Sequence, residues 1–228
     1  MKSTARSDST LVIPRMHTAE EAVPLTEAQE GLWYAQRLSP ANPIFNTAHC
    51  TDFTGALQLP ALQHAINQAL LEADALSLHM IDSDQGPLQY FDATHRVQLE
   101  IIDLRHQPDA IHQAAELMHA DHNHPLDPTQ APLSRQVLFL LSDTHCQWYQ
   151  RVHHLAADGY GMSLIESRAL ALYREQLYSD ETPSAALTSF AEVVADDQRY
   201  RHSEKRQKDA AYWHEALASI GDVGSLTS

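Results

Sequence analysis

Apolar side chains recur with a helical period in several stretches of this chain. The clearest stretch covers residues 60–73, where apolar residues fall at steps of three and four and Pro60 stands in the first turn. An earlier helix is expected over 26–38, because Thr26 is a suitable N-cap and the SPANP segment that follows breaks a helix. Further helices are expected within 107–124 and at 161–177, 188–201 and 204–219.

In two of these helices the period defines a particular face. Within 107–124 that face consists of Ile111, Ala114, Ala115 and Met118. In the last helix the period is kept by Ala210, Trp213, His214 and Leu217. Such a face is the one by which an amphipathic helix packs against a core.

Between the helices, shorter segments have the character of β-strands. The segment 134–142 is apolar almost throughout, which predicts a central strand that is covered on both faces. It is followed, after a connection of hairpin length, by a strand at 146–154. The other expected strands are 46–56, 76–81, 87–91 and 98–102. Mixed helices and strands with a central hairpin predict an α+β fold, in which helices cover a largely antiparallel sheet.

The end of the strand at 146–154 carries the most distinctive polar pattern, RVHHLAADGYG. Side chains of a strand alternate between its faces, so His154 and His153 point in opposite directions. A histidine at a strand end is a reasonable general base, and Asp158 can either cap the turn that follows or hold an arginine or an imidazole. Gly159 and Gly161 would let the chain turn sharply into the next helix without a Cβ clash. From the residues alone, an active site, a metal site and a simple helix start all stay open.

Composition narrows the class of protein. The chain has 228 residues, 43% of them apolar, and a formal charge of −15, which argues against nucleic-acid binding through a broad basic face. There is no apolar run long enough for a membrane span, and the first residues lack the apolar core of a secretory signal. Cys50 and Cys146 are too few for a disulfide framework or a thiolate zinc cluster. These features favour a cytoplasmic location.

The segment HADHNH is a candidate metal site, since two of its histidines stand three residues apart on an expected helix. The segment is a helix end without a visible set of supporting residues, and zinc is bound more convincingly by HxxxH or HExxH. The two histidines of the HH pair lie on opposite strand faces and could not easily share one ion. We therefore predict no metal, and the residues set aside are His119, Asp121, His122 and His124.

The segment HHLAADG resembles the HHxxxDG signature of condensation domains in nonribosomal peptide synthetases, whose fold is shared with chloramphenicol acetyltransferase. Other segments support this resemblance in the right order over about 25–215. LTEAQEGLWYAQRLSP resembles the first motif of the family, and 61–80 lies where a helix should lead into its HExLR strand. TSFAEVVADDQRY, at 188–200, resembles the later Asp-Phe-Ala motif.

The chain departs from the family pattern in two ways. Ser77 stands where the second motif has arginine, with Asp74 for its glutamate, and Ser189 replaces the aspartate of the later motif. If the arginine is structural, either another base substitutes for it or the fold is weakened there. The family domain also has two lobes, and this chain corresponds to the first, which carries the histidine wall of a channel between them.

Composition and the resemblance together predict how the chain is divided. The polar residues 1–24 would be a flexible tail, and the resemblance implies that 25–180 form the N-terminal lobe of a condensation domain that carries HHxxxDG. Residues 181–220 would be a helical segment leading toward the second lobe, and 221–228 a linker or an end.

The resemblance also implies amide-bond formation between a donor acyl or peptidyl thioester and an acceptor aminoacyl thioester. His154 would orient the acceptor amine and could take its proton, while His153, Asp158 and Gly159 would support the site. The implied partners are donor and acceptor carrier domains and the second lobe, with substrates arriving as phosphopantetheine thioesters and no cofactor bound by the chain itself. The first motif begins only about 24 residues after Met1, and this position favours a siderophore synthetase. The alternatives are a stand-alone acyl-CoA-dependent acyltransferase of the same fold and a non-catalytic module that binds carrier proteins.

Overall fold

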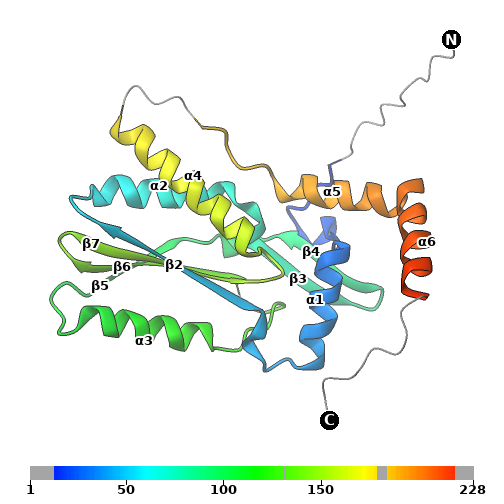
Figure 1. The fold of residues 1–228 in the computed structure, drawn as a ribbon, viewed down its shortest axis with the longest axis horizontal. Helices are drawn as coiled ribbons and strands as arrows, with labels where there is room; N and C mark the ends of the chain where they lie inside the picture. The colour runs from blue at the N-terminus through cyan, green and yellow to red at the C-terminus, as the bar shows by residue number, and fades with distance from the viewer. Residues whose placement is uncertain (1–12, 131, 179–183, 219–228) are drawn as a thin grey trace.

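The computed structural model describes residues 13–130, 132–178 and 184–218, which build two sheets and the helices around them (Figure 1). In the larger sheet the strand order is β2, β7, β6, β5. These strands are β2 (Asn46–Thr54), β7 (His145–His153), β6 (Ser134–Ser142) and β5 (Leu99–Asp103). All neighbours are antiparallel except β5, which runs parallel to β6. The expected α+β class, with a mixed and mostly antiparallel sheet covered by helices, is confirmed.

The β6–β7 hairpin is the centre of this sheet, as expected, and β6 is buried on both faces. Helices α2 (Leu59–Glu72) and α4 (Gly159–Leu177) cover one face, and α3 (Ala110–His122) covers the other (Figure 1). Alternate side chains of β6 point to the two sides, so Leu138 belongs to the core under α2 and α4 whereas Phe139 packs with Ala114 of α3. The end of β7 is thus fixed between two layers of helices.

A smaller antiparallel sheet, in the order β1, β4, β3, is joined to the N-terminal segment. Its strands are β1 (Val23–Pro24), β4 (Gly86–Phe91) and β3 (Leu78–Ser83), with short 3-10 turns at Ala19–Glu21, Pro43–Phe45, Asp74–Ser77 and Ala93–His95. The structure differs here from the expected tail at 1–24. Met16 is fully buried, and its carbonyl accepts a hydrogen bond from the Phe91 backbone, because the smaller sheet needs this segment to cover its apolar face.

The first helix, α1 (Glu27–Leu38), begins as expected with Thr26 as N-cap, and Gln29 completes a reciprocal capping box. Helix α5 (Phe190–Arg201) lies against α1 and is followed by α6 (Glu204–Ala218). Arg201 ties α5 to α1 through an ion pair to Glu30 at 2.9 Å and a hydrogen bond to the Leu25 carbonyl at 2.9 Å. The C-terminal helical segment is therefore packed onto the lobe at α5 rather than only leading away from it.

Two expected helix faces are only partly right. In α3, Ala114 is buried and Met118 is partly buried, but Ile111 is 57% exposed and Ala115 is also exposed. The helix crosses the sheet on the line of Ala110, Ala114 and Met118, so the neighbouring apolar positions face solvent.

In α6 no residue is buried, and Trp213 and Leu217 are more than half exposed. The apolar period of this helix is real, but among the described residues it faces no core. The expected linker at 221–228 and the first twelve residues lie outside the described residues. No helix within the described ranges combines the length and apolar character needed to cross a bilayer.

Candidate functional site

The two histidines lie where β7 ends and the chain turns into α4. The strand ends at His153, and the His154 backbone N–H donates to the Phe45 carbonyl at 2.8 Å. The His153 carbonyl accepts from the Ala156 N–H at 2.8 Å, which closes the turn. Because both ends of the turn are held by backbone hydrogen bonds, the position of His154 is set by the sheet and not by a free loop.

His154 is half-buried and lines a cavity of about 960 Å³. Four parts of the chain form its walls: the first turns of α1, the turn after α2, the 154–161 turn with the start of α4, and the segment that leads into α5. Most of the wall is apolar, so a polar group of a ligand would find few partners apart from His154 and the loop backbone. Its larger apolar side chains are Leu32, Leu76, Leu155, Leu164, Ile165, Leu187, Phe190 and Val193.

His153 has a different environment and does not line this cavity. It is 1% exposed, and its Nδ1 accepts the Leu155 N–H at 3.2 Å, which leaves the proton of the neutral ring on Nε2. Burial, together with the charge of Arg151 and with His154, lowers the pKa of His153 to about 4. The ring is therefore neutral at pH 7, which fits a structural residue that holds the turn.

This low pKa predicts a stability that depends on pH. The unfolded chain takes up the His153 proton near pH 6.5 and the folded chain only near 4, so stability is complete above pH 6.5 and falls as pH drops toward 4. The difference between the two pKa values corresponds to a loss of about 3 kcal/mol in unfolding free energy as the pH falls from 6.5 to 4. In urea titrations from pH 7 to pH 4, His153→Gln should reduce the pH slope between 6.5 and 4 by about one proton. The exposed His214→Gln is the control, and an unchanged slope in His153→Gln would contradict the assignment.

Asp158 is the N-cap of α4. Its carboxylate accepts the Gly161 N–H at 2.8 Å, and its carbonyl accepts the Met162 N–H at 3.0 Å. The loop-shaping role expected for Asp158 thus has a definite form, because the side chain fixes the angle at which α4 leaves the histidine turn. The carboxylate is exposed and lies beside the cavity mouth.

The glycine at 159 is not required in the way expected. Gly159 is the first residue of α4, its φ is not positive, and a Cβ there would meet nothing within 4 Å. The turn is made by the extended backbone of Asp158 instead. At Gly161 a Cβ would come within 3.3 Å of the Ala157 Cβ, so the second glycine is the sterically tighter of the two.

Replacing Asp158 by alanine should therefore loosen the start of α4. We expect a loss of about 1 kcal/mol in unfolding free energy, measured by chemical denaturation. Asp158→Ser keeps an oxygen that can accept the Gly161 N–H and should recover most of that loss. Equal losses in the two variants would show that the cap is not what matters at this position.

Gln29 is a residue of the site for which the sequence analysis predicts no role beyond its place in a motif. It is buried, and its side-chain amide donates to the Leu155 carbonyl at 2.8 Å. The same amide exchanges hydrogen bonds with Gln89 of β4, at 2.8 Å in each direction. Gln29 thus joins α1, the smaller sheet and the histidine turn. Two signals were available, the first motif of the family and the capping-box spacing from Thr26 to Gln29, and neither pointed to contact with the histidine turn.

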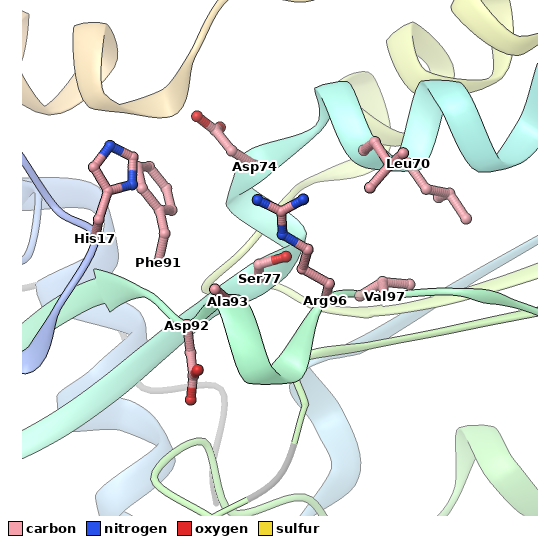
Figure 2. A pocket seen from close by; sticks show the side chains of 10 residues that line it. His17, Leu70, Asp74, Ser77, Phe91, Asp92, Ala93, Arg96 and Val97 are labelled. Atoms are coloured by element: carbon pink, nitrogen blue, oxygen red, sulfur yellow. The ribbon is translucent and has the colours of Figure 1, made fainter.

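The position of the missing arginine lies in a second, smaller pocket of about 120 Å³ (Figure 2). Ser77, Asp74 and Arg96 line this pocket, and the guanidinium group of Arg96 points toward Asp74. A basic residue, Arg96, thus lines the same pocket as Ser77, and it comes from the segment just after the Ala93–His95 turn. Of the two expectations for this departure, the structure favours substitution by another base.

Asp74 and Ser189, the two other departures from the family motifs, are in direct contact. The Ser189 hydroxyl donates to the Asp74 carboxylate at 2.5 Å, and the Phe190 N–H donates to the same carboxylate at 2.9 Å. Ser189 is also the N-cap of α5, accepting the Ala191 N–H at 3.2 Å. The two motifs therefore meet at the wall of the cavity.

The residues of the rejected metal site are used in other ways. Asp121 forms ion pairs with Arg151 and Arg135, each at 3.1 Å, and accepts the Tyr149 hydroxyl at 2.9 Å. Burial would raise the pKa of Asp121, but the charge and hydrogen bonds of these partners outweigh it and lower the pKa. Within the part of the chain that the structure describes, no group of three or more metal-ligating side chains is placed to hold an ion. The prediction of no metal remains a prediction.

The fold and the histidine turn together indicate the class of protein to which this chain belongs, and the comparison with protein families gives the same class. The family described as "Condensation domain" matches residues 19–227, and the chain belongs to this family. Its resemblance to condensation domains of nonribosomal peptide synthetases is confirmed by relatives across the same region.

Among these relatives are the dimodular nonribosomal peptide synthase of Bacillus subtilis (strain 168) and enterobactin synthase component F of Escherichia coli (strain K12). Each is 35% identical, over 202 residues (89% of this chain) and 207 residues (90% of this chain) respectively. Among solved structures, the starter condensation domain of rhizomide synthetase has a TM-score of 0.79 at 33% identity. The first condensation domain of the calcium-dependent antibiotic synthetase has a TM-score of 0.73 at 29% identity.

The share of each relative that is matched bears on function. This chain spans 8% and 16% of the two synthetases named above. The alignment with the rhizomide starter domain covers 88% of this chain and 49% of the solved chain. The alignment with the antibiotic synthetase domain covers 91% of this chain and 50% of the solved chain. The chain therefore corresponds to about half of a solved condensation domain.

Proposed function

We propose that this chain is the histidine-bearing lobe of a condensation domain that forms an amide bond between two thioester-bound substrates. The observation that carries the proposal is the position of His154. It stands on a rigid turn, half-buried, and lines a large and mostly apolar cavity. An amine that enters this cavity meets one imidazole at a fixed place, which is the arrangement that positioning catalysis requires.

In the proposed reaction the acceptor amine attacks the carbonyl carbon of the donor thioester. The new C–N bond forms as the C–S bond breaks, the thiol leaves, and the amine gives up one proton. His154 accepts a hydrogen bond from the attacking amine and holds its lone pair toward the carbonyl. The neutral His153 supports the turn from behind, and Asp158 fixes the helix that follows it.

The cysteines are poor candidates for a covalent step. Burial raises the pKa of both Cys50 and Cys146 to about 11, with a smaller contribution from Asp52. A thiol with such a pKa is almost entirely protonated at pH 7 and is a weak nucleophile. Neither residue lines the cavity. Direct attack of amine on thioester needs no enzyme nucleophile.

The proposed partners follow from the proposal that this lobe forms only one wall of the site. A second lobe of the same domain would supply the opposite wall, and donor and acceptor carrier domains would deliver the substrates on phosphopantetheine arms. A variant of the rhizomide starter domain was solved in complex with C8-CoA and Leu-SNAC, an acyl thioester and an aminoacyl thioester. That pair of ligands supports the same two substrate classes here, and it keeps a stand-alone acyl-CoA-dependent reaction as the second candidate.

The test is reconstitution of the lobe within its intact domain, with one carrier loaded with an acyl group and one with an amino acid. The expected product is the acylated aminoacyl thioester on the acceptor carrier, detected by mass spectrometry. Replacing the donor carrier by acyl-CoA distinguishes the second candidate. Carrier binding without any product, unchanged by His154→Ala, would instead establish a non-catalytic module.

A further inference from the structure

One wall of the cavity is formed by residues 184–190, which we call the strap. It consists of a segment without helix or strand, 184–189, and the first residue of α5, and it contributes Ala186, Leu187, Thr188 and Phe190 to the cavity lining. Such a segment has no hydrogen-bonded ladder or helix of its own, so its position depends on what the rest of the molecule offers to its backbone.

The first attachment of the strap is at Ser184. The Glu175 carboxylate accepts the Ser184 N–H at 2.7 Å and its hydroxyl at 2.6 Å. Arg168 donates to the Ser184 carbonyl at 3.1 Å and also contacts its hydroxyl. Both partners belong to α4, so the strap begins anchored to the helix that the histidine turn starts.

The second and third attachments come from two carboxylates at the end of α2. Glu72 accepts the Leu187 N–H at 3.2 Å while it forms a two-point ion pair with Arg168 at 2.7 and 2.9 Å. Hydrogen bonding from Arg168 lowers the pKa of Glu72, which keeps the carboxylate ionised. Asp74 accepts the Phe190 N–H and the Ser189 hydroxyl. Charge-assisted bonds of this kind hold a backbone more firmly than neutral ones.

These attachments decide which atoms of the strap face the cavity. Because the backbone N–H groups of Leu187 and Phe190 are bound by carboxylates on the α2 side, their side chains are presented to the cavity. Leu164 and Ile165 of α4 also line the cavity. The strap and α4 thus both contribute apolar side chains to it, which suits an alkyl group rather than a charged one.

We propose that the strap is the specificity wall of the site, that it selects an apolar acyl or side-chain group on a thioester substrate, and that Glu72 and Asp74 are the positioning residues that set its place. This inference rests on the proposed function and adds to it the chemistry of the selected group. The group could belong to the donor or to the acceptor, and the experiment separates the two.

The experiment uses the intact domain and four thioester probes. Octanoyl- and acetyl-pantetheine form the donor arm, and leucyl- and glycyl-pantetheine form the acceptor arm. Binding is measured by calorimetry, and kcat and KM are measured where turnover occurs. Leu187→Ala should reduce the preference for the larger probe about tenfold in one arm and leave the other arm unchanged, since apolar pockets discriminate by factors of this order.

The positioning role is tested by Asp74→Ala. Asp74→Asn is the conservative variant for comparison, and Asp84→Ala is the control. Asp74→Ala should raise KM for the larger substrate about fivefold relative to KM for the smaller one, because the strap that would contact the larger group loses one of its attachments. Asp74→Asn keeps an oxygen that can accept the Phe190 N–H and should recover the preference. Asp84 is exposed in the β3–β4 turn, away from the cavity lining, and its replacement should change nothing.

The inference is overturned if Leu187→Ala leaves the preference unchanged in both arms, or if Asp74→Ala lowers kcat equally for all substrates. The proposed function fails in a different way, by full activity of His154→Ala. Because binding of the four probes is measured without turnover, the strap is tested even where no amide is formed.

Discussion

Replacing His154 by alanine is expected to slow amide formation by the intact domain about 10²- to 10⁴-fold, the range by which a positioned acid–base group accelerates a reaction. His154 is the histidine of the pair that lines the cavity, and none of the described residues forms a hydrogen bond to its ring. Its removal should therefore leave the fold intact. The measurements are single-turnover rates with both carriers loaded, and the thermal midpoint of each variant as a check on folding.

Variants of His154 also distinguish a general base from a group that only orients the amine. A general base is usually held by a third group, as the aspartate holds the histidine of a catalytic triad, but the nearby Asp158 is occupied in capping α4. We therefore expect His154 to act mainly as a hydrogen-bond acceptor that orients the amine. On that basis His154→Gln, which retains an acceptor, should be at least about tenfold faster than His154→Ala. If the two are equally slow, proton transfer is the role; if His154→Ala retains full activity, the assignment is wrong. His214→Ala, on the exposed face of α6, is the control.

The sequence predicted the elements whose own residues decide their structure. The helix at 60–73, the capped start at Thr26 and the β6–β7 hairpin all appear within a few residues of the expected bounds. In each case the information is local, since an apolar stripe, a capping residue or an apolar strand forms the same element in many contexts. The alternation that separated His153 from His154 is of the same kind, because it depends only on the geometry of one strand.

What the sequence could not predict depends on contacts between distant segments. The burial of Met16 needs the smaller sheet, and the exposure of Ile111 depends on the line along which α3 crosses the larger one. In the site, Gln29 reaches Leu155 across 126 positions of sequence, and Asp74 reaches Ser189 across 115. No spacing rule connects such pairs. The cavity wall was therefore missed, although the histidine turn was placed correctly at the end of a strand.

A buried charge network behind the histidine turn gives the second large expectation. Asp121→Ala should lower the free energy of unfolding by about 3 kcal/mol or more, because it leaves Arg151 charged and unpaired in a buried place. Both side chains of this ion pair are 11% exposed. One Arg151 nitrogen, Nη1, is already buried without a hydrogen-bond partner among the described residues, so the guanidinium has no second acceptor to replace the lost one. Chemical denaturation of the chain measures the effect.

The controls for this expectation use the same helix and the same network. Glu116→Ala removes an exposed carboxylate of α3 and should cost no more than about 0.5 kcal/mol. Replacing the pair together, as Asp121→Leu with Arg151→Met, should recover much of the loss, because apolar residues of similar volume often substitute for a buried ion pair without cost. Recovery would show that the penalty of Asp121→Ala comes from the stranded charge of Arg151. If the double variant is as unstable as the single one, Arg135 or Tyr149 depends on Asp121 instead, and the carboxylate rather than the pair holds α3 to the strand that ends at the histidines.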